Sequence, residues 1–165
     1  MIGLLALGKS DFENVNEFHT DEEFYKNSLG IAYGIPSESS LRNRLDGIGV
    51  SMNQQILDGN IDMFQSCQFE PSALENGFVP VDIDVSPFDN SGSHKAGVSR
   101  TYKNFDGYAP IFAYIGKEGY LCNAELREGK QHCQNGTPEF LSETIAAAMR
   151  AGLPVIIAYS QSSIP

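Results

Sequence analysis

The spacing of hydrophobic residues changes about halfway along the chain, from a helical period to a strand period. Before residue 75, apolar residues recur every three or four positions, as on a helix with one buried face. Residues 79–85 then read VPVDIDV and alternate strictly, with valine or isoleucine on one face and proline or aspartate on the other. The change predicts an α+β chain in which a helical region, residues 1–75, precedes a sheet-forming region, residues 76–165.

Two consecutive helices are expected in the first region. Thr20 is the predicted N-cap of a helix that ends at Leu29, and Ser37 is the predicted N-cap of a helix that stops at Gly47. Two helices around a short glycine turn have the rhythm of a helix-turn-helix, in which the early residues of the second helix face the major groove of DNA. An ordinary αα-hairpin fits the same pattern, and the acidic flank at residues 21–23 favours that alternative.

Two stretches of the chain carry side chains suited to DNA. Hydroxyl, amide and guanidinium groups bind phosphates and base edges, and the second helix offers Ser39, Ser40, Arg42, Asn43 and Arg44 on the side opposite its leucines. A second, sparser basic stretch with interleaved aromatic residues contains Lys95, Arg100 and Lys103. Such a stretch can follow a nucleic-acid backbone, and a solvated loop is the alternative.

The second half of the chain predicts the order β–β–β–α–β. After the strand at 79–85, residues 87–97 have the composition of a loop, and residues 108–116 and 120–129 form two strands joined as a hairpin by GKEG. A helix follows, with Thr137 as its N-cap, Pro138 in the first turn and Gly152 at its end. The apolar run at 153–159 has the composition of a buried strand.

The acidic face of the first strand is the candidate metal site. Asp82 and Asp84 lie two residues apart on that face, and a strand holds a carboxylate rigidly. Divalent cations that act on phosphate esters need several oxygen ligands in one place. Alternating acids on an exposed strand are also a common surface pattern, so a plain surface role stays open. Asp89 can instead cap a turn, and Arg127 can clamp a carboxylate or a phosphate.

Composition limits these functions further. The net charge of −10 excludes indiscriminate nucleic-acid binding, so any DNA contact must be local. The three cysteines are far apart, and the adjacent His132 and Cys133 have no second Cys/His pair to complete a tetrahedral zinc site. No apolar run approaches the roughly 20 residues that span a bilayer, and the N-terminus lacks the basic flank of a signal peptide. A cytoplasmic protein with reduced thiols and no membrane contact is expected.

Four ordered blocks of sequence resemble the DDE transposases of bacterial insertion sequences, whose catalytic domain is ribonuclease H-like. The blocks read GIPSESSLRNRLD, VDIDVSPFDNSG, YKNFDGYAPIFAYIG and ELREGKQHCQNG. The resemblance implies an N-terminal helical DNA-binding region, here with a helix-turn-helix-like pair, followed by part of a ribonuclease H-like β-β-β-α-β sheet. It also implies that the partner is DNA, namely the ends of the element.

The resemblance gives roles to the two aspartates. In that family three acids bind two magnesium ions, which activate water or a 3′-hydroxyl for attack on a DNA phosphodiester. The first acid lies on the first strand in an Asp-x-Ser/Thr setting, which matches Asp84 as the catalytic residue and metal ligand, with Asp82 as the second choice. The resemblance also favours DNA contacts by Arg42 and Arg44.

One departure from the family pattern changes the expected activity. The strand after the helix should end in Arg-x-Asp-Ser-Gly, which supplies the second acid, but Ala158 and Ser160 stand where Arg and Asp would fall. The third acid would lie beyond residue 165. The expectation is therefore a truncated, inactive form, such as a frameshift or an early stop would leave.

The alternatives are a non-enzymatic DNA-binding fragment that regulates an intact transposase, and a product without function. Without later elements the strand near 154–159 would be an apolar sheet edge, a candidate for aggregation or for pairing with another chain in a homo-oligomer.

Overall fold

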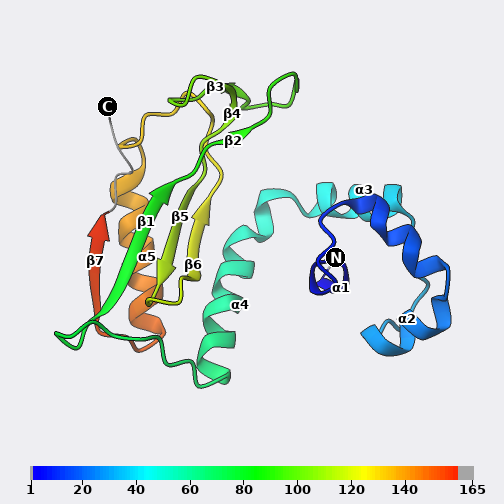
Figure 1. Cartoon of the computed structure of the whole chain (residues 1–165), viewed down its shortest axis with the longest axis horizontal. Helices are drawn as coiled ribbons and strands as arrows, with labels where there is room; N and C mark the ends of the chain where they lie inside the picture. Colours follow the sequence, from blue (N-terminus) through cyan, green and yellow to red (C-terminus); the bar gives the residue numbers. More distant parts are fainter. Residues whose placement is uncertain (1, 160–165) are drawn as a thin grey trace. The chain divides into compact units, whose positions relative to one another are not determined.

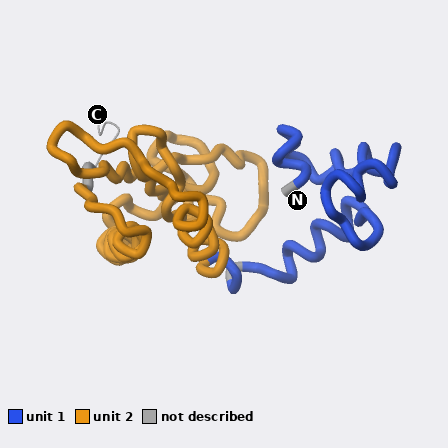
Figure 2. The backbone as a smooth tube through the Cα atoms, turned by 90° about the horizontal axis from the view of Figure 1, so that it is seen from below, with its two compact units in different colours: residues 1–53 blue, residues 54–165 orange. Residues whose placement is uncertain are grey.

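The chain forms two compact units, residues 1–53 and residues 54–165 (Figure 2). The structure is a computed structural model and describes residues 2–159. It contains both helices and sheets, so the predicted α+β class is confirmed.

The first unit is helical throughout. Its elements are α1 (Ile2–Ala6), η1 (Phe12–His19), α2 (Glu22–Leu29), α3 (Glu38–Ile48) and η2 (Gly49–Met52). They enclose a small core of five buried side chains, Leu4, Val15, Phe18, Ile35 and Leu41. Each helix is short, so this shared core, rather than helix propensity, must stabilise the unit.

Of the two helix N-caps expected in this unit, one is confirmed and the other lies one residue away. Asp21, not Thr20, caps α2, because the Asp21 carboxylate accepts a hydrogen bond from the Phe24 backbone N–H (3.2 Å), while the Thr20 hydroxyl donates to a carbonyl of the preceding turn. Ser37 is confirmed as the cap of α3, where its hydroxyl accepts from the backbone N–H of Ser40 (3.3 Å). Aspartate and threonine are both good caps, so adjacent candidates cannot be ranked from sequence.

The connection between α2 and α3 has the predicted ends, Leu29 and Ser37, but it is long for a helix-turn-helix. Residues 30–37 join the two helices, whereas the turn of a helix-turn-helix has three or four residues. The second helix also continues through Gly47 and ends at Gly49, which has a positive φ of 53°. Both helices pack against η1. The first unit is thus a helical unit in which η1 joins α2 and α3.

The second unit is built on a four-stranded sheet (Figure 1). Along the chain its main elements are α4 (Asn53–Ser66), β1 (Val79–Val85), β5 (Ile111–Ile115), β6 (Tyr120–Glu125), α5 (Thr137–Arg150) and β7 (Val155–Tyr159). The strand order is β6-β5-β1-β7, with β7 parallel to β1 and the other pairs antiparallel. The expected hairpin of β5 and β6 is confirmed, and the last strand, β7, pairs beside β1.

The main core lies between α5 and one face of this sheet. The predicted alternation of β1 is confirmed, since Val79, Val81 and Ile83 are at most 4% exposed and belong to the same core cluster as Phe140 and Ala148 of α5. Figure 1 shows α5 behind the strands, with no described helix in front of them. One face of the sheet is therefore covered, and the other carries the polar residues of β1.

Helix α4 belongs to the second unit by its packing. Ile61 and Phe64 join the core under the sheet, and Asp58 forms an ion pair with Arg150 of α5 (2.6 Å). The sequence pattern changes from helix to strand near residue 75, whereas the packing divides the chain before α4. Hydrophobic periodicity predicts that a helix has a buried face, but it does not indicate which unit that face packs against.

A second, three-stranded sheet follows β1. It consists of β2 (Phe88–Asp89), β4 (Asp106–Tyr108) and β3 (Ser99–Arg100), in the order β2-β4-β3. Figure 1 shows this small sheet beyond the carboxyl end of β1. The sequence predicted only a loop over 87–97, and β2 corrects that prediction at residues 88–89. Strands of two or three residues contain too few positions for an alternating pattern to be recognised.

Close backbone contacts hold the small sheet together, and they predict opposite effects for two glycine substitutions. A Cβ on Gly129 would lie 2.1 Å from the Ser99 carbonyl oxygen and 2.3 Å from that of Gly107, whereas a Cβ on Gly59 of α4 would meet no atom within 4 Å. Gly129→Ala should destabilise the fold by more than ~1 kcal/mol because the backbone must move. Gly59→Ala should stabilise it by about 0.5–1 kcal/mol. Urea unfolding of the two variants checks this, and a Gly129→Ala protein as stable as wild type would contradict it.

Candidate functional site

Asp82 and Asp84 lie on the inner strand β1, on the sheet face opposite α5. In the register of the antiparallel pair, Asp84 is opposite Phe112 of β5 and Asp82 is opposite Tyr114. Asp84 is half-buried, while Asp82 is exposed. Strand β1 pairs with β5 at both aspartates and with β7 at Asp82, so the sheet fixes the backbone from which the two carboxylates project.

Ser86 orients the Asp84 carboxylate. The Ser86 hydroxyl donates to Asp84 Oδ2 over 2.8 Å, and the backbone N–H of Ser86 donates to the Pro110 carbonyl just before β5. The serine is thus tied to the sheet while it binds the carboxylate. A hydroxyl two residues after an aspartate on a strand gives that aspartate a defined rotamer.

The structure brings the basic stretch to the end of β1 that carries Asp84. The Tyr102 hydroxyl donates to the carbonyl oxygen of Val85, the residue next to Asp84 (3.2 Å). Lys103 lies over the ring of Tyr102, 5.8 Å from its centroid, and Arg100 lies 3.9 Å from Asp106 across the β3–β4 pair. Lys95 is exposed in the loop before β3.

The five candidate DNA-binding residues of α3 are all exposed: Ser39, Ser40, Arg42, Asn43 and Arg44. Three of them are engaged by the unit itself. The Ser39 hydroxyl shares a hydrogen bond with the Ser37 hydroxyl (3.2 Å). The Arg42 guanidinium forms an ion pair with Glu38 (2.9 Å) and lies 4.6 Å from the centroid of the Phe12 ring, and the Ser40 hydroxyl accepts from Ser37. Arg44 has no acidic partner among the described residues, which makes it the better candidate for an intermolecular contact.

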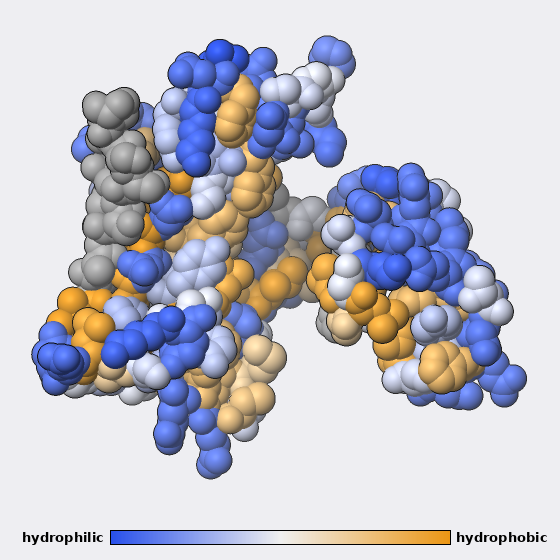
Figure 3. All heavy atoms as spheres, viewed as in Figure 1, coloured by the Kyte–Doolittle hydropathy of each residue, from blue (hydrophilic) through white to orange (hydrophobic). Residues whose placement is uncertain are grey.

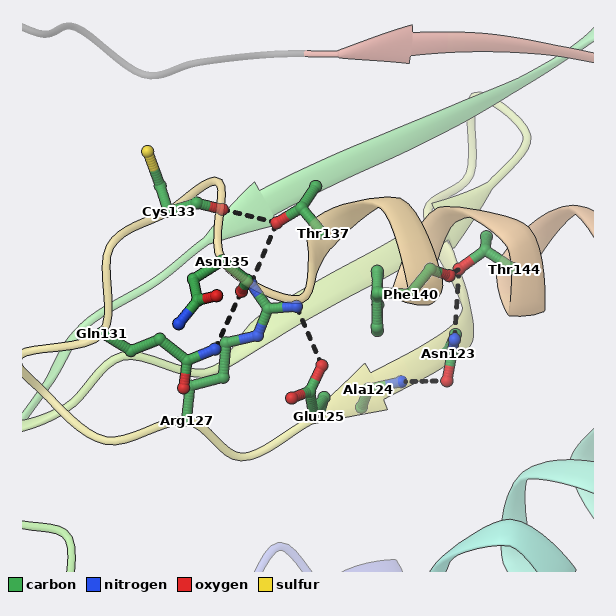
Figure 4. Close-up of polar contacts among 10 residues, drawn as sticks. All are labelled: Asn123, Ala124, Glu125, Arg127, Gln131, Cys133, Asn135, Thr137, Phe140 and Thr144. Carbon is green, nitrogen blue, oxygen red and sulfur yellow. Dashed lines mark hydrogen bonds and ion pairs between the residues drawn. The ribbon is translucent and has the colours of Figure 1, made fainter.

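Arg127 clamps a carboxylate of its own chain (Figure 4). Its guanidinium is buried and donates to Glu125 (2.8 Å) and to the Thr137 hydroxyl (3.0 Å), which itself donates to the Cys133 carbonyl. The sequence predicted Thr137 as the N-cap of α5, and this prediction is wrong. Gly136 is the N-cap, and the Thr137 side chain belongs to the buried hydrogen-bond network of Arg127. Arg127 thereby fastens the end of β6 to the start of α5.

Asp89 caps a turn, the alternative considered from sequence. Its Oδ1 accepts from the backbone N–H of Ser91 (2.8 Å). Hydrogen bonding by the Ser91 hydroxyl and backbone N–H lowers the pKa of Asp89. Hydrogen bonds from Ser72 likewise lower the pKa of Glu118, in the β5–β6 turn. Both carboxylates therefore accept hydrogen bonds that stabilise the fold of the chain.

Among the described residues, no three His, Cys, Asp or Glu side chains gather in a group that could hold a metal ion. No described helix is both long enough and apolar enough to cross a membrane. Asp82 and Asp84 thus stand as a pair rather than as part of a larger acidic cluster.

Comparison with known proteins gives no relative. No family model, no curated protein and no solved structure matches the chain. Any function therefore has to be argued from the site itself.

Burial makes Cys122 of β6 an unreactive thiol, and the effect should be visible in the pH dependence of stability. Cys122 is 1% exposed, and this burial raises its pKa to about 11, against a smaller opposing effect of the Arg150 charge. A raised pKa contributes stability that is complete below the unfolded-state value and is lost as pH rises through the folded-state value. Wild type should therefore lose more unfolding free energy than Cys122→Ala between about pH 9 and 11.

Urea titrations at each pH measure this difference, and identical slopes for the two proteins would contradict it. Alkylation provides a check on the folded state. At neutral pH iodoacetamide should label the exposed Cys67 and leave Cys122 unlabelled.

Proposed function

We propose that this chain contains the DNA-binding unit and the first metal ligand of a DDE-type DNA transposase with a ribonuclease H-like domain. The observation that carries the proposal is the position of Asp84 near the end of β1, an inner strand flanked by antiparallel β5 and parallel β7. In a ribonuclease H-like sheet, three antiparallel strands precede a helix, and the next strand returns beside the first. The order β6-β5-β1-β7, with α5 before β7, is consistent with that arrangement.

The donor set at Asp84 suits a single hard cation in the presence of DNA. Magnesium is commonly bound through one or two carboxylates together with substrate phosphates. Asp84 can supply one carboxylate, and Asp82, on the same face, is the only other acid of β1. When bound, such an ion would polarise a phosphodiester and lower the pKa of a coordinated water.

The described residues do not supply a two-metal site. Strand transfer with two ions needs further carboxylates, and β7 places Ala158 opposite Asp82 of β1 rather than an acid. These 165 residues should therefore bind DNA without cutting it. This is also the behaviour of the alternative candidate, a regulatory DNA-binding fragment, which the exposed Arg44 and Asn43 of α3 favour.

Metal binding tests the assignment of Asp84. Mn²⁺ added to the protein with a short duplex DNA should broaden the NMR signals of β1 and β5 around Asp84, because a paramagnetic ion relaxes nearby nuclei. In Asp84→Asn the apparent affinity should fall by a factor of ten or more, on the scale of metal-site mutations. Asp62→Asn removes an exposed acid on α4 and should change nothing. Equal broadening in wild type and Asp84→Asn would refute the metal assignment.

DNA binding tests the first unit separately. Arg44→Ala should weaken binding to a mixed-sequence duplex and reduce the slope of log K against log salt by about 1, because one phosphate contact is lost. Lys117→Ala removes one positive charge from the β5–β6 turn and serves as the matched control. Fluorescence anisotropy at several salt concentrations gives both quantities. If Arg44→Ala behaves like Lys117→Ala, α3 does not bind DNA.

A further inference from the structure

A row of aromatic rings lies on the same sheet face as the two aspartates. The ring centroids of Phe88 and Phe112 are 5.9 Å apart, and those of Phe112 and Tyr114 are 6.1 Å apart. The planes of neighbouring rings are inclined by 39° and 32°. Cross-strand pairing sets each aspartate beside a ring, with Asp84 opposite Phe112 and Asp82 opposite Tyr114.

These rings remain accessible because α5 covers the opposite face. Phe88 is 50% exposed, and Phe112 and Tyr114 are half-buried. Figure 3 views the sheet from the side away from α5, and hydrophobic atoms lie there among hydrophilic ones at the surface. Three neighbouring aromatic rings at the surface form a contiguous apolar patch, and such patches are typical of binding surfaces.

The small sheet at the edge of this face carries lysines as well as the acids Asp89 and Asp106. Tyr102, 53% exposed, connects the 101–105 turn to the end of β1, and Lys103 of the same turn lies over its ring. Lys95 precedes β3 in the same small sheet and has no acidic partner among the described residues. Aromatic rings next to lysines are the combination that binds single strands, with bases stacked on the rings and phosphates along the cations.

We infer that this face binds unpaired DNA, with bases stacked on Phe88, Phe112 and Tyr114 and phosphates contacted by Lys95 and Lys103. The inference rests on the proposed function and deepens it, because it makes an unpaired DNA end, rather than an intact duplex, the substrate at Asp84. Bases inside a duplex expose only their edges in the grooves, so they cannot stack on these rings. A base on Phe112 would place its neighbouring phosphate beside the Asp84 carboxylate.

Binding of a labelled single-stranded oligothymidylate in the presence of Mg²⁺ tests this inference. The double variant Phe88→Leu/Phe112→Leu keeps apolar side chains but removes two stacking surfaces, so its affinity should fall at least ~5-fold. Phe78→Leu alters an exposed aromatic residue just before β1, at the other end of the strand, and should bind as wild type does. A duplex of the same length should bind equally to all three proteins.

Thermal unfolding of each variant establishes that it is folded, and the single variant Phe88→Leu, at a half-exposed position, provides the same test with less risk to the core. Unchanged affinity of both aromatic variants for the single strand would overturn the inference, as would an equal loss of duplex binding. Analytical sedimentation tests whether a second copy of the chain covers this face instead. If the wild type is a dimer and the double variant is a monomer, the face is a contact between copies and the inference is overturned.

The outcome is separable from that of the metal experiment. If the aromatic variants lose single-strand affinity while Asp84→Asn leaves Mn²⁺ broadening unchanged, the stacking face stands and the metal assignment fails. If Asp84 binds the ion but the aromatic variants bind as wild type does, the stacking face alone is refuted.

Discussion

The alternation of β1 is the constraint on which the second unit depends. Its aliphatic residues must face α5, since Val81 and Ile83 are each 1% exposed, and the period of two then sends Asp82 and Asp84 to the other face. A shift of one residue in register would put both carboxylates into an apolar core, where an unpaired charge costs far more than the shift could recover. The pairing of β1 with β5 and with β7 is thus specified by the same residues that place the candidate site. Core and site cannot be varied independently on this strand.

Much of this arrangement follows from the sequence because its elements are long enough to show a period. The strand at 79–85, the hairpin around GKEG and the helix at 137–150 each contain several repeats of the relevant spacing, and each is found in the structure. The small β2–β4–β3 sheet could not be found in this way. It depends on contacts between segments far apart in the chain, such as the approach of Gly129 to Ser99 and Gly107, and such contacts leave no local pattern.

Some features of the candidate site can likewise be predicted from the sequence, whereas others require the folded structure. Asp82 and Asp84 are evident from the alternation, and Ser86 is close enough in sequence for its hydrogen bond to Asp84 to be guessed. That Tyr102 binds the Val85 carbonyl, and so carries the basic turn to the end of β1, requires the folded chain. The role of Arg127 also requires the folded chain. Its guanidinium is buried near the start of α5, where it binds Glu125 rather than an external anion.

Several of the positively charged side chains already interact with acidic residues of the same chain. Arg42 pairs with Glu38, Arg100 lies near Asp106, and Arg127 is buried against Glu125. Among the candidate DNA contacts this leaves Arg44, Lys95 and Lys103 without an acidic partner in the described residues.

Three phosphate contacts would give a slope of log K against log salt of only about −3, and the net charge of −10 opposes even these contacts. Electrostatic attraction alone would therefore be too weak for the DNA binding that we propose, which would need stacking or a bridging cation as well. The aromatic row beside two carboxylates could supply both, so the proposed nucleic-acid function rests on the exposed face of the sheet more than on the basic residues.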